Sequence, residues 1–435
     1  MTTKEVNFTV HHVARVEGHG NIIVNAKDGK IEECKWEIPE SPRFFESMLR
    51  GLDYRDVNFI APRICGICAV AHATASIEAA EKAFNVKLTE QAQLVRQLLF
   101  DAETVTSHVL HTYFLVAPDF FGVGSVIPLA ATHTDVVLRA LRLKKVANDW
   151  ADMLCGRKTH PISQVAGGFV KWPTIEQLKW LKQALEGDYM KDLEITVDLF
   201  KTLKFPDFVR ETEYIAITKP DEYAFVSGST GMIGSSDAKP TPVNDYLKVT
   251  NEFCVPQSTA KWTKHLRESY QVGALARFNV NYDRLHPRAK KVAQALGIKA
   301  PCYNPFFISV AQLVEIMHAV ENSIMILDKL LSKGIKQEKP EVKVKAGRGV
   351  GCVEAPRGIL FHDYTFDDNG KLIAANIIIP TNENHNSIQH DFEKLLPEVI
   401  DQPQDKIKLT MEMLVRAYDP CISCSTHMLE VKFKE

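Results

Sequence analysis

Two pairs of cysteines near opposite ends of this 435-residue chain constrain its fold more than any other feature. Cys65 and Cys68 form a C-x-x-C motif in RICGICAVAH, and Cys421 and Cys424 form another in DPCISCSTH. Four soft thiolates at this spacing can bind zinc, an iron–sulfur cluster or nickel. If the two pairs share one metal, the fold must bring the beginning and the end of the chain together.

A structural zinc site is the simplest alternative for these cysteines. Such sites usually draw both ligand pairs from one short module whose folding the metal drives. These pairs are instead far apart in a chain long enough to build a core without metal. The sequence nearby also carries groups that zinc would not need, namely an acid in RVEGH (Glu17), an arginine in EAPRG (Arg357) and a histidine after each pair (His72 and His427).

Composition describes a soluble globular protein. Hydrophobic residues make up 45% of the chain and charged residues 24%, and the formal net charge is -2. A balance so close to neutral gives no overall field that would attract nucleic acid or anionic lipid. The N-terminus lacks the apolar run of a signal peptide, and we find no stretch of the roughly 20 apolar residues that span a bilayer. We therefore expect a cytoplasmic protein with no nucleic-acid partner and no membrane segment.

Hydrophobic periodicity predicts an α+β, mainly helical chain. Alternating apolar stretches predict an N-terminal β-meander, and GILFHDYTF and LIAANIIIP, joined by DDNGK, predict a β-hairpin. The glycines of GRGVG, at 347–351, predict a turn before EAPRG. Apolar residues at helical spacing predict helices over about 69–84, 89–116, 135–153, 175–203, 305–333, 385–396 and 405–416.

Residues 205–270 are the least regular part of the sequence and predict loops with short strands, as an excursion from the helical part. We find no internal repeat, low-complexity tract or clear linker. Residues 1–435 are therefore expected to form a single integrated domain.

Seven motifs, taken in order, resemble one known family. The motifs are RVEGHG, PRFFE, RICGICAVAH, GRKTHPISQVAGG, YQVGALARFNVN, EAPRGILFHDY and DPCISCSTH. They resemble the successive signatures of the large, catalytic subunit of [NiFe] hydrogenases and extend over essentially the whole chain. The resemblance implies that family's fold, with a central helix bundle and small peripheral β-sheets. It also implies reversible, heterolytic oxidation of dihydrogen to protons and electrons.

The resemblance also implies the metal ligands. Cys65 and Cys421 would be terminal ligands of nickel, and Cys68 and Cys424 would bridge nickel to an iron carrying cyanide and carbon monoxide, a Ni-Fe(CN)2(CO) centre. A thiolate that bridges two metals has shared its lone pairs, so a terminal thiolate is the better proton acceptor when dihydrogen is cleaved. Cys421 is the expected acceptor.

Three residues match groups that the family places around this centre. Glu17 matches a carboxylate that passes protons beside the terminal cysteine, although a surface residue in a glycine-rich turn is the alternative. Arg357 matches an arginine over the iron, where its charge and planar shape suit anionic diatomic ligands. Its alternative role is a surface ion pair. Thr381 matches a hydroxyl that donates to a cyanide.

Two more residues match supporting groups. His72 lies one helical turn beyond Cys68 and could hydrogen-bond that sulfur, although a histidine on an alanine-rich helix is more often simply packed. Asp419 precedes Cys421 and retains an acid of the family. Ser107, in contrast, stands where many members carry an aspartate, which is usual in the cytosolic branch. Asn382 stands where the family often has a second hydroxyl.

A magnesium site and a removable tail are implied as well. Glu46, in PRFFE, and His427 match the family's ligands for a buried Mg²⁺, a hard cation that keeps several waters. The alternative for Glu46 is a solvated helix residue. In the family a maturation protease cuts a precursor after this histidine, which makes 428–435 a possible removable tail.

Electrons must leave such a chain through another protein. The five cysteines outside the two pairs are scattered singly, so we expect no iron–sulfur cluster in this chain. The resemblance implies an iron–sulfur small subunit, together with further electron-transfer subunits. These would be of a heterodisulfide reductase-like type or, as the alternative, the flavin or NAD(P) module of an NADP-linked sulfhydrogenase.

Two other classes of protein remain open. A quinone-reducing subunit of the complex I type shares the fold but typically lacks the cysteine quartet. A zinc-stapled scaffold would need the cysteines but not Glu17, Arg357 or Thr381.

Overall fold

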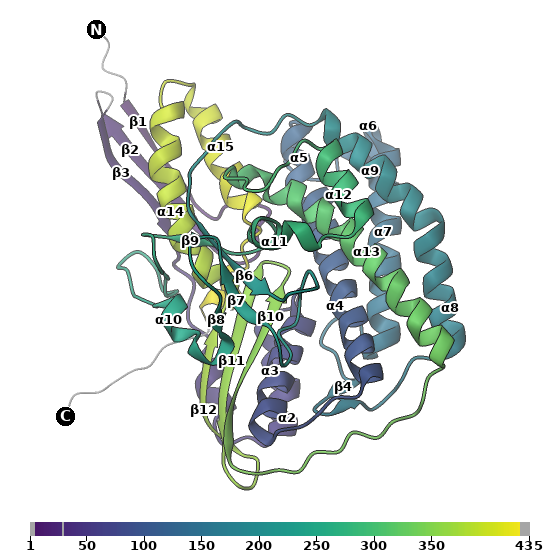
Figure 1. The fold of residues 1–435 in the computed structure, drawn as a ribbon. Coiled ribbons are helices and arrows are strands. Elements are labelled where there is room, and N and C mark those ends of the chain that lie inside the picture. Colours follow the sequence, from purple (N-terminus) through teal and green to yellow (C-terminus); the bar gives the residue numbers. More distant parts are fainter. Residues whose placement is uncertain (1–4, 28–29, 427–435) are drawn as a thin grey trace, which may run out of the picture.

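The N-terminal segment folds as the predicted β-meander. The structure is a computed structural model that describes residues 5–27 and 30–426. Three antiparallel strands pair in the order β1-β2-β3, with bounds Glu5–Val10, Asn21–Lys27 and Lys30–Glu37. The buried indole of Trp36 donates to Nδ1 of His385 on α14 (Pro380–Val399), at 3.0 Å. The meander therefore lies against a helix from the far end of the chain (Figure 1).

Long helices form the other side of the molecule (Figure 1). Thr89 opens the first of them as predicted, because its hydroxyl accepts the N–H of Ala92 at 3.1 Å. A π-helical segment, His111–Val116, continues this helix to its predicted end. The predicted helix over 175–203 is two helices, separated at Gly187 by a non-helical backbone. The bounds are Glu90–Leu110 for α4, Thr134–Cys155 for α7, Ile175–Ala184 for α8, Met190–Thr202 for α9 and Ile308–Lys333 for α13.

The helix α13 is the central helix of this layer. By length and composition Pro305–Lys333 could cross a membrane, but 78% of its most apolar window is buried inside the protein. The expectation that no stretch of the chain is long and apolar enough to cross a membrane is therefore wrong. A long apolar helix also occurs when a helix is surrounded by protein on all sides.

The predicted turn at 347–351 is wrong, because these residues begin a strand, β10, that packs on the helix α3. A Cβ atom on Gly349 would lie 2.1 Å from the carbonyl oxygen of Ala79, and one on Gly351 would lie 1.9 Å from that of Ala75. The glycines thus let the strand touch the backbone of the helix. The bounds are Ala69–Phe84 for α3 and Gly347–Ala355, Gly358–Phe366 and Leu372–Ile378 for the antiparallel strands β10, β11 and β12.

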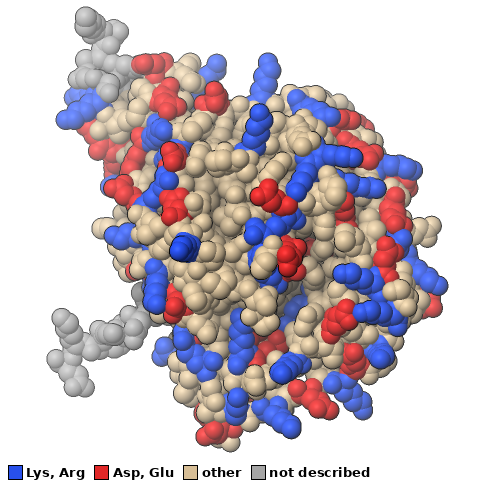
Figure 2. Space-filling model, in the orientation of Figure 1, with Lys and Arg blue, Asp and Glu red and all other residues tan. Residues whose placement is uncertain are grey.

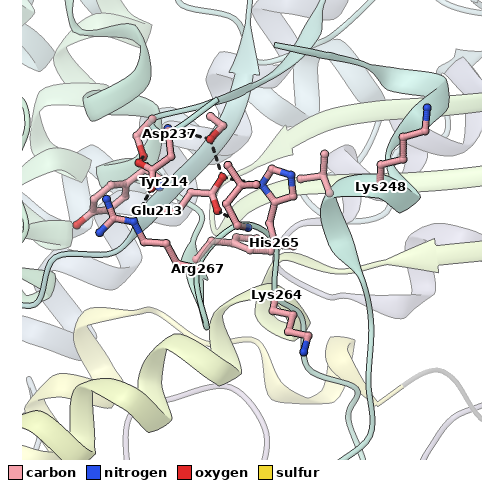
Figure 3. A network of polar contacts seen from close by, with 12 residues as sticks. Glu213, Tyr214, Asp237, Lys248, Lys264, His265 and Arg267 are labelled. Atoms are coloured by element: carbon pink, nitrogen blue, oxygen red, sulfur yellow. Dashed lines mark hydrogen bonds and ion pairs between the residues drawn. The ribbon is translucent and has the colours of Figure 1, made fainter. Parts of the chain in front are cut away.

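The irregular segment 205–270 contains short strands, as predicted. They form a sheet in the order β8-β7-β6-β9, with bounds Thr241–Pro242, Met232–Ser235, Glu213–Thr218 and Tyr270–Gln271. The buried Glu213 ties the segment together (Figure 3). Its Oε1 lies 2.6 Å from the hydroxyl of Ser235 and 2.7 Å from Nδ1 of His265, and its Oε2 accepts the N–H of Leu266 at 3.1 Å.

The C-terminal helix α14 begins earlier than predicted. Pro380 lies in its first turn, where proline's fixed φ is suited to a helix start. The next helix, α15 (Gln404–Ala417), agrees with prediction, and a short α16 (Ile422–Ser425) follows it. The remaining elements are α1 (Phe45–Leu49), α2 (Tyr54–Ile60), α5 (Ala117–Phe120), α6 (Leu129–Thr132), β4 (Gln164–Val165), β5 (Gly168–Phe169), α10 (Leu247–Thr250), α11 (Ala274–Asn281) and α12 (Pro287–Ala295).

Charged side chains are spread over the surface. Basic and acidic residues are interspersed on the face shown in Figure 2, in keeping with the formal net charge of -2.

Candidate metal centre

The four paired cysteines meet in the interior. Their Sγ atoms all lie within 4.8 Å of one another, and each residue is at most 4% exposed. Cys65 and Cys421, which are 356 positions apart, have Sγ atoms 3.6 Å apart, and those of Cys421 and Cys424 are 2.6 Å apart. Cys68 occupies the N-cap position of α3, and Cys421 occupies that of α16. The fold thus brings the two ends of the chain together, as a shared metal site requires.

The surroundings of Cys65 favour a thiolate. Its Sγ accepts the N–H groups of Ile67 at 3.3 Å and Cys68 at 3.0 Å. Burial raises the pKa of a thiol, and it does so for Cys421 and Cys424, but hydrogen bonds from the other thiols hold the pKa of Cys65 well below its usual range. Four buried sulfurs can lose their protons together only beside a cation. The donor set therefore fits a thiophilic metal.

Glu17 lies beside the C-terminal cysteines. It forms an isolated parallel β-bridge with Cys421, and its carbonyl oxygen accepts the N–H of Ile422 at 2.9 Å. Its Oε2 accepts the N–H of Ser423 at 3.1 Å. The residue is half-buried, and its carboxylate contacts the segment between Cys421 and Cys424.

Arg357 lies in the two-residue turn between β10 and β11. Its Nε donates to the carbonyl oxygen of Asp419 at 2.6 Å, and its Nη2 donates to Oδ1 of Asp419 at 2.9 Å. Burial opposes its charge, but Asp419 and the thiolates of Cys421, Cys68 and Cys65 raise its pKa. Its buried Nη1 has no hydrogen-bond partner among the described residues, which leaves donors for an anionic group.

Two further side chains hold the cysteine segments in place. The hydroxyl of Thr381 accepts the N–H of Cys421 at 3.0 Å. Arg43 was not singled out from the sequence, although it lies in the PRFFE motif. Its Nη2 donates to the carbonyl oxygens of Ile64, at 2.7 Å, and Ser423, the residues that precede Cys65 and Cys424.

A family model described as nickel-dependent hydrogenase matches residues 43–137 and 240–427, which include all four cysteines. The chain belongs to the nickel-dependent hydrogenase family. Its four thiols are accordingly the residues that would hold the nickel–iron group.

Relatives and solved structures of hydrogenases match nearly the whole length of this hydrogenase. It is 34% identical to the alpha subunit of sulfhydrogenase 1 of Pyrococcus furiosus, over 98% of both chains. It is 29% identical to one subunit of the vhc F420-non-reducing hydrogenase of Methanococcus voltae, over 97% of this chain and 95% of the other.

The fold is shared with a solved NAD+-reducing [NiFe]-hydrogenase, at 24% identity, a TM-score of 0.86 and coverage of 97% of this chain and 99% of the other. The [NiFeSe] hydrogenase of Desulfovibrio vulgaris Hildenborough gives a TM-score of 0.73 at 24% identity, over 98% and 100% of the two chains.

His72 of the hydrogenase is held by a partner that sequence reasoning missed. Its Nδ1 lies 3.0 Å from Nε2 of His362, whose Nδ1 lies 2.7 Å from the hydroxyl of Tyr364. Burial lowers the pKa of His72 to about 4, so its imidazole is neutral. The contact predicted with the Cys68 sulfur stays a prediction. The only signal for His362 in the sequence was its place in the EAPRGILFHDY motif.

Ser107 and Asp419 each keep a buried oxygen without a partner in the described part of the chain. The Ser107 hydroxyl and Oδ2 of Asp419 are both buried without a hydrogen-bond partner among the described residues. His111, which sequence reasoning also missed, lies with its Nε2 2.6 Å from the carbonyl oxygen of Arg416 and 4.0 Å from Oδ1 of Asp419. Asp419 is therefore the carboxylate that pairs with Arg357.

The expected magnesium site is only partly described, because His427 and the tail 428–435 lie outside the described residues. Glu46 accepts the N–H of Ile377 at 2.5 Å, and burial raises its pKa to about 7. The charges of Lys261 and Glu252 act on the same carboxyl. A buried oxygen of Glu252, Oε1, has no partner within the described part of the chain. Two half-buried carboxyl groups whose charges act on each other are ligands that suit a hard cation.

Proposed function

We propose that this protein cleaves dihydrogen heterolytically at a nickel–iron group held by Cys65, Cys68, Cys421 and Cys424. The cluster of four buried thiols is the observation that carries the proposal. The group supplies the place where dihydrogen binds and where its electrons are taken up. The protein supplies the thiolates, the proton acceptor and a buried setting away from water.

Cys421 is the proposed proton acceptor, and Glu17 the proposed next carrier. The two residues share a backbone bridge, and the Glu17 side chain is half-buried. A carboxyl group that faces both a buried site and the surface can pass a proton with little movement.

Arg357 is proposed to face the anionic diatomic ligands with its unpartnered Nη1. Asp419 fixes the rest of the guanidinium, so the remaining donors have a defined direction. Thr381 already accepts from the N–H of Cys421, which orients its hydroxyl hydrogen away from that bond. Magnesium at Glu46 and His427 is proposed as a structural ion.

Metal analysis combined with infrared spectroscopy tests the proposal. Nickel and iron in equal amounts, with bands of carbon monoxide and cyanide, are expected of the purified protein. Zinc alone, without these bands, would contradict it. A Cys421→Ser and a Cys34→Ser variant form a matched pair, because Cys34 lies outside the cluster. Only the first should lose nickel.

Electron transfer is proposed to run to an iron–sulfur small subunit. Among the described residues the four cysteines form the one group of clustered metal-ligating side chains, and the proposal assigns the iron–sulfur relay to another subunit. A heterodisulfide reductase-like partner stays the first candidate and a flavin or NAD(P) module the alternative, because this chain is equally identical, at 31%, to a second sulfhydrogenase and to an F420-non-reducing hydrogenase. Co-purified subunits and the acceptor that the complex reduces with dihydrogen test this choice.

A cytoplasmic location and a maturation protease remain proposals. Cell fractionation tests the first. The intact mass of the mature chain tests the second, because cleavage after His427 would remove 428–435.

A further inference from the structure

A fully buried ion cluster lies beneath the turn that carries Arg357. Its members are Arg277 on α11, Glu315 on α13 and Glu354 on β10, and all three side chains are 0% exposed. Glu315 binds Nε and Nη2 of Arg277 at 2.6 Å each, and Glu354 binds Nη1 at 2.9 Å. A charge cluster so far from water is costly to maintain, so it calls for an explanation beyond stability.

The two donors of Arg277 that remain reach the turn itself. Nη1 donates to the carbonyl oxygen of Ala355, and Nη2 donates to that of Pro356, both at 3.0 Å. A guanidinium has five N–H donors, and here all five are used. The two carbonyl groups are those of the residues just before Arg357. Arg277 therefore fixes the backbone from which the Arg357 side chain extends.

The same helix also supports the turn at a second point. A Cβ atom on Gly273, which precedes α11, would lie 2.9 Å from the carbonyl oxygen of Arg357. Arg357 is thus held at both ends. Arg277 binds the two carbonyl groups that precede it, Gly273 packs against its own carbonyl group, and Asp419 holds its guanidinium. Only Nη1 is left without a partner among the described residues.

We infer that Arg277 is a positioning residue for Arg357, and that its five hydrogen bonds set the direction of the free Nη1 toward the diatomic ligands. The inference rests on the role proposed above for Arg357. Lysine in place of Arg277 keeps a positive charge beside Glu315, but its three donors on one nitrogen cannot reach two carboxylates and two carbonyls in one plane. The turn would then loosen, and Arg357 would lose its alignment.

The test compares Arg277→Lys with Tyr223→Phe in the purified holoenzyme complex. Tyr223 is the matched control, because its hydroxyl donates to Oε1 of Glu315 at 2.5 Å and no hydrogen bond joins it to the turn in the described structure. For Arg277→Lys we expect dihydrogen oxidation per nickel to fall by about 10-fold or more, with little change in KM. The infrared bands of the diatomic ligands should shift, and the peptide over 355–360 should exchange amide hydrogen faster. Tyr223→Phe should leave the turnover, the bands and this exchange unchanged.

Wild-type turnover with unshifted bands in Arg277→Lys would overturn the inference. If Arg277→Lys does not accumulate as a folded protein, Glu354→Gln decides, because it removes one carboxylate from the guanidinium while keeping the side chain's shape. Shifted bands support the inference, and unshifted bands with wild-type turnover overturn it.

Arg357→Lys separates this outcome from failure of the proposed function. If that variant is itself unimpaired, the role of Arg357 is wrong, whereas an impaired Arg357→Lys beside an unimpaired Arg277→Lys refutes only the positioning role.

Discussion

Glu17 and Cys421 pair in an isolated parallel β-bridge, so residues from the two ends of the chain share backbone hydrogen bonds. The carbonyl oxygen of Glu17 accepts the N–H of Ile422, and its carboxylate accepts that of Ser423. The backbone contact does not depend on the side chain. The acidity of position 17 can therefore be removed without moving the cysteine.

Glu17→Gln should abolish the exchange of dihydrogen with solvent protons while nickel and iron stay bound. Glutamine keeps an oxygen for the N–H of Ser423 but cannot carry a proton, so a loss of about 100-fold or more is expected. Proton–deuterium exchange followed by mass spectrometry measures it. Glu40→Gln is the control, because Glu40 is a nearby carboxylate that binds the N–H of His19. Exchange at the wild-type rate in Glu17→Gln would show that protons leave by another route.

Thr381→Val should weaken the C-terminal half of the metal site. It leaves the buried N–H of Cys421 without its acceptor, which costs about 1–3 kcal/mol. Thr381→Ser keeps the hydroxyl and should behave nearly as wild type. Nickel retention during dialysis against a chelator, together with urea denaturation, measures the difference. Equal nickel loss in both variants would speak against this contact.

Gly349→Ala should destabilise the packing of β10 on α3. The added Cβ would meet the carbonyl oxygen of Ala79 at 2.1 Å, and backbone on both sides leaves little room to relax. A cost of about 1–3 kcal/mol is expected from overpacking. In Gly124→Ala no heavy atom of the described chain lies within 4 Å of the new Cβ, so its stability should hardly change. Thermal unfolding compares the two variants.

Asp101 should make stability fall as pH rises. Burial raises its pKa to about 8, although Ser323 and Asn322 donate to it. The folded state therefore keeps a proton that the unfolded state releases near pH 4, and the free energy of unfolding loses up to about 1.4 kcal/mol per pH unit from pH 4 to 8. Asp101→Asn should remove the contribution of one proton from this pH dependence of the free energy of unfolding. Asp135→Asn, with a side chain that is 75% exposed, should not. Urea denaturation at pH 5, 6, 7 and 8 measures the slopes.

Local sequence signals predicted the helices and strands whose structure is determined by their own residues. The apolar period and the cap at Thr89 predicted α4, and the alternation in GILFHDYTF predicted β11. The strand at Gly349 was missed because its glycines are needed for close contact with α3, a helix far away in the sequence. Pro380 could have marked the start of α14, but the apolar run before it resembled a strand that continues.

The site shows the same division. The family resemblance carried by the motifs around the cysteines predicted that the two pairs share one metal centre, and the structure places the four thiols together. Residues that act through the backbone were not foreseen, because nothing near Arg43 or Arg277 in the sequence shows which carbonyl groups they bind. His362 was missed for the same reason, since its contact with His72 joins positions 290 residues apart.

The contact between the first and last segments also sets the order in which this protein loses its function. Half of the thiol donors belong to a stretch that ends a few residues before the described chain does, and a handful of hydrogen bonds from Glu17, Arg43 and Thr381 hold it. Segments held by few contacts open more readily than helical cores. On warming, metal escape should thus precede the loss of helices, so a preparation can keep its circular dichroism spectrum after its nickel is gone.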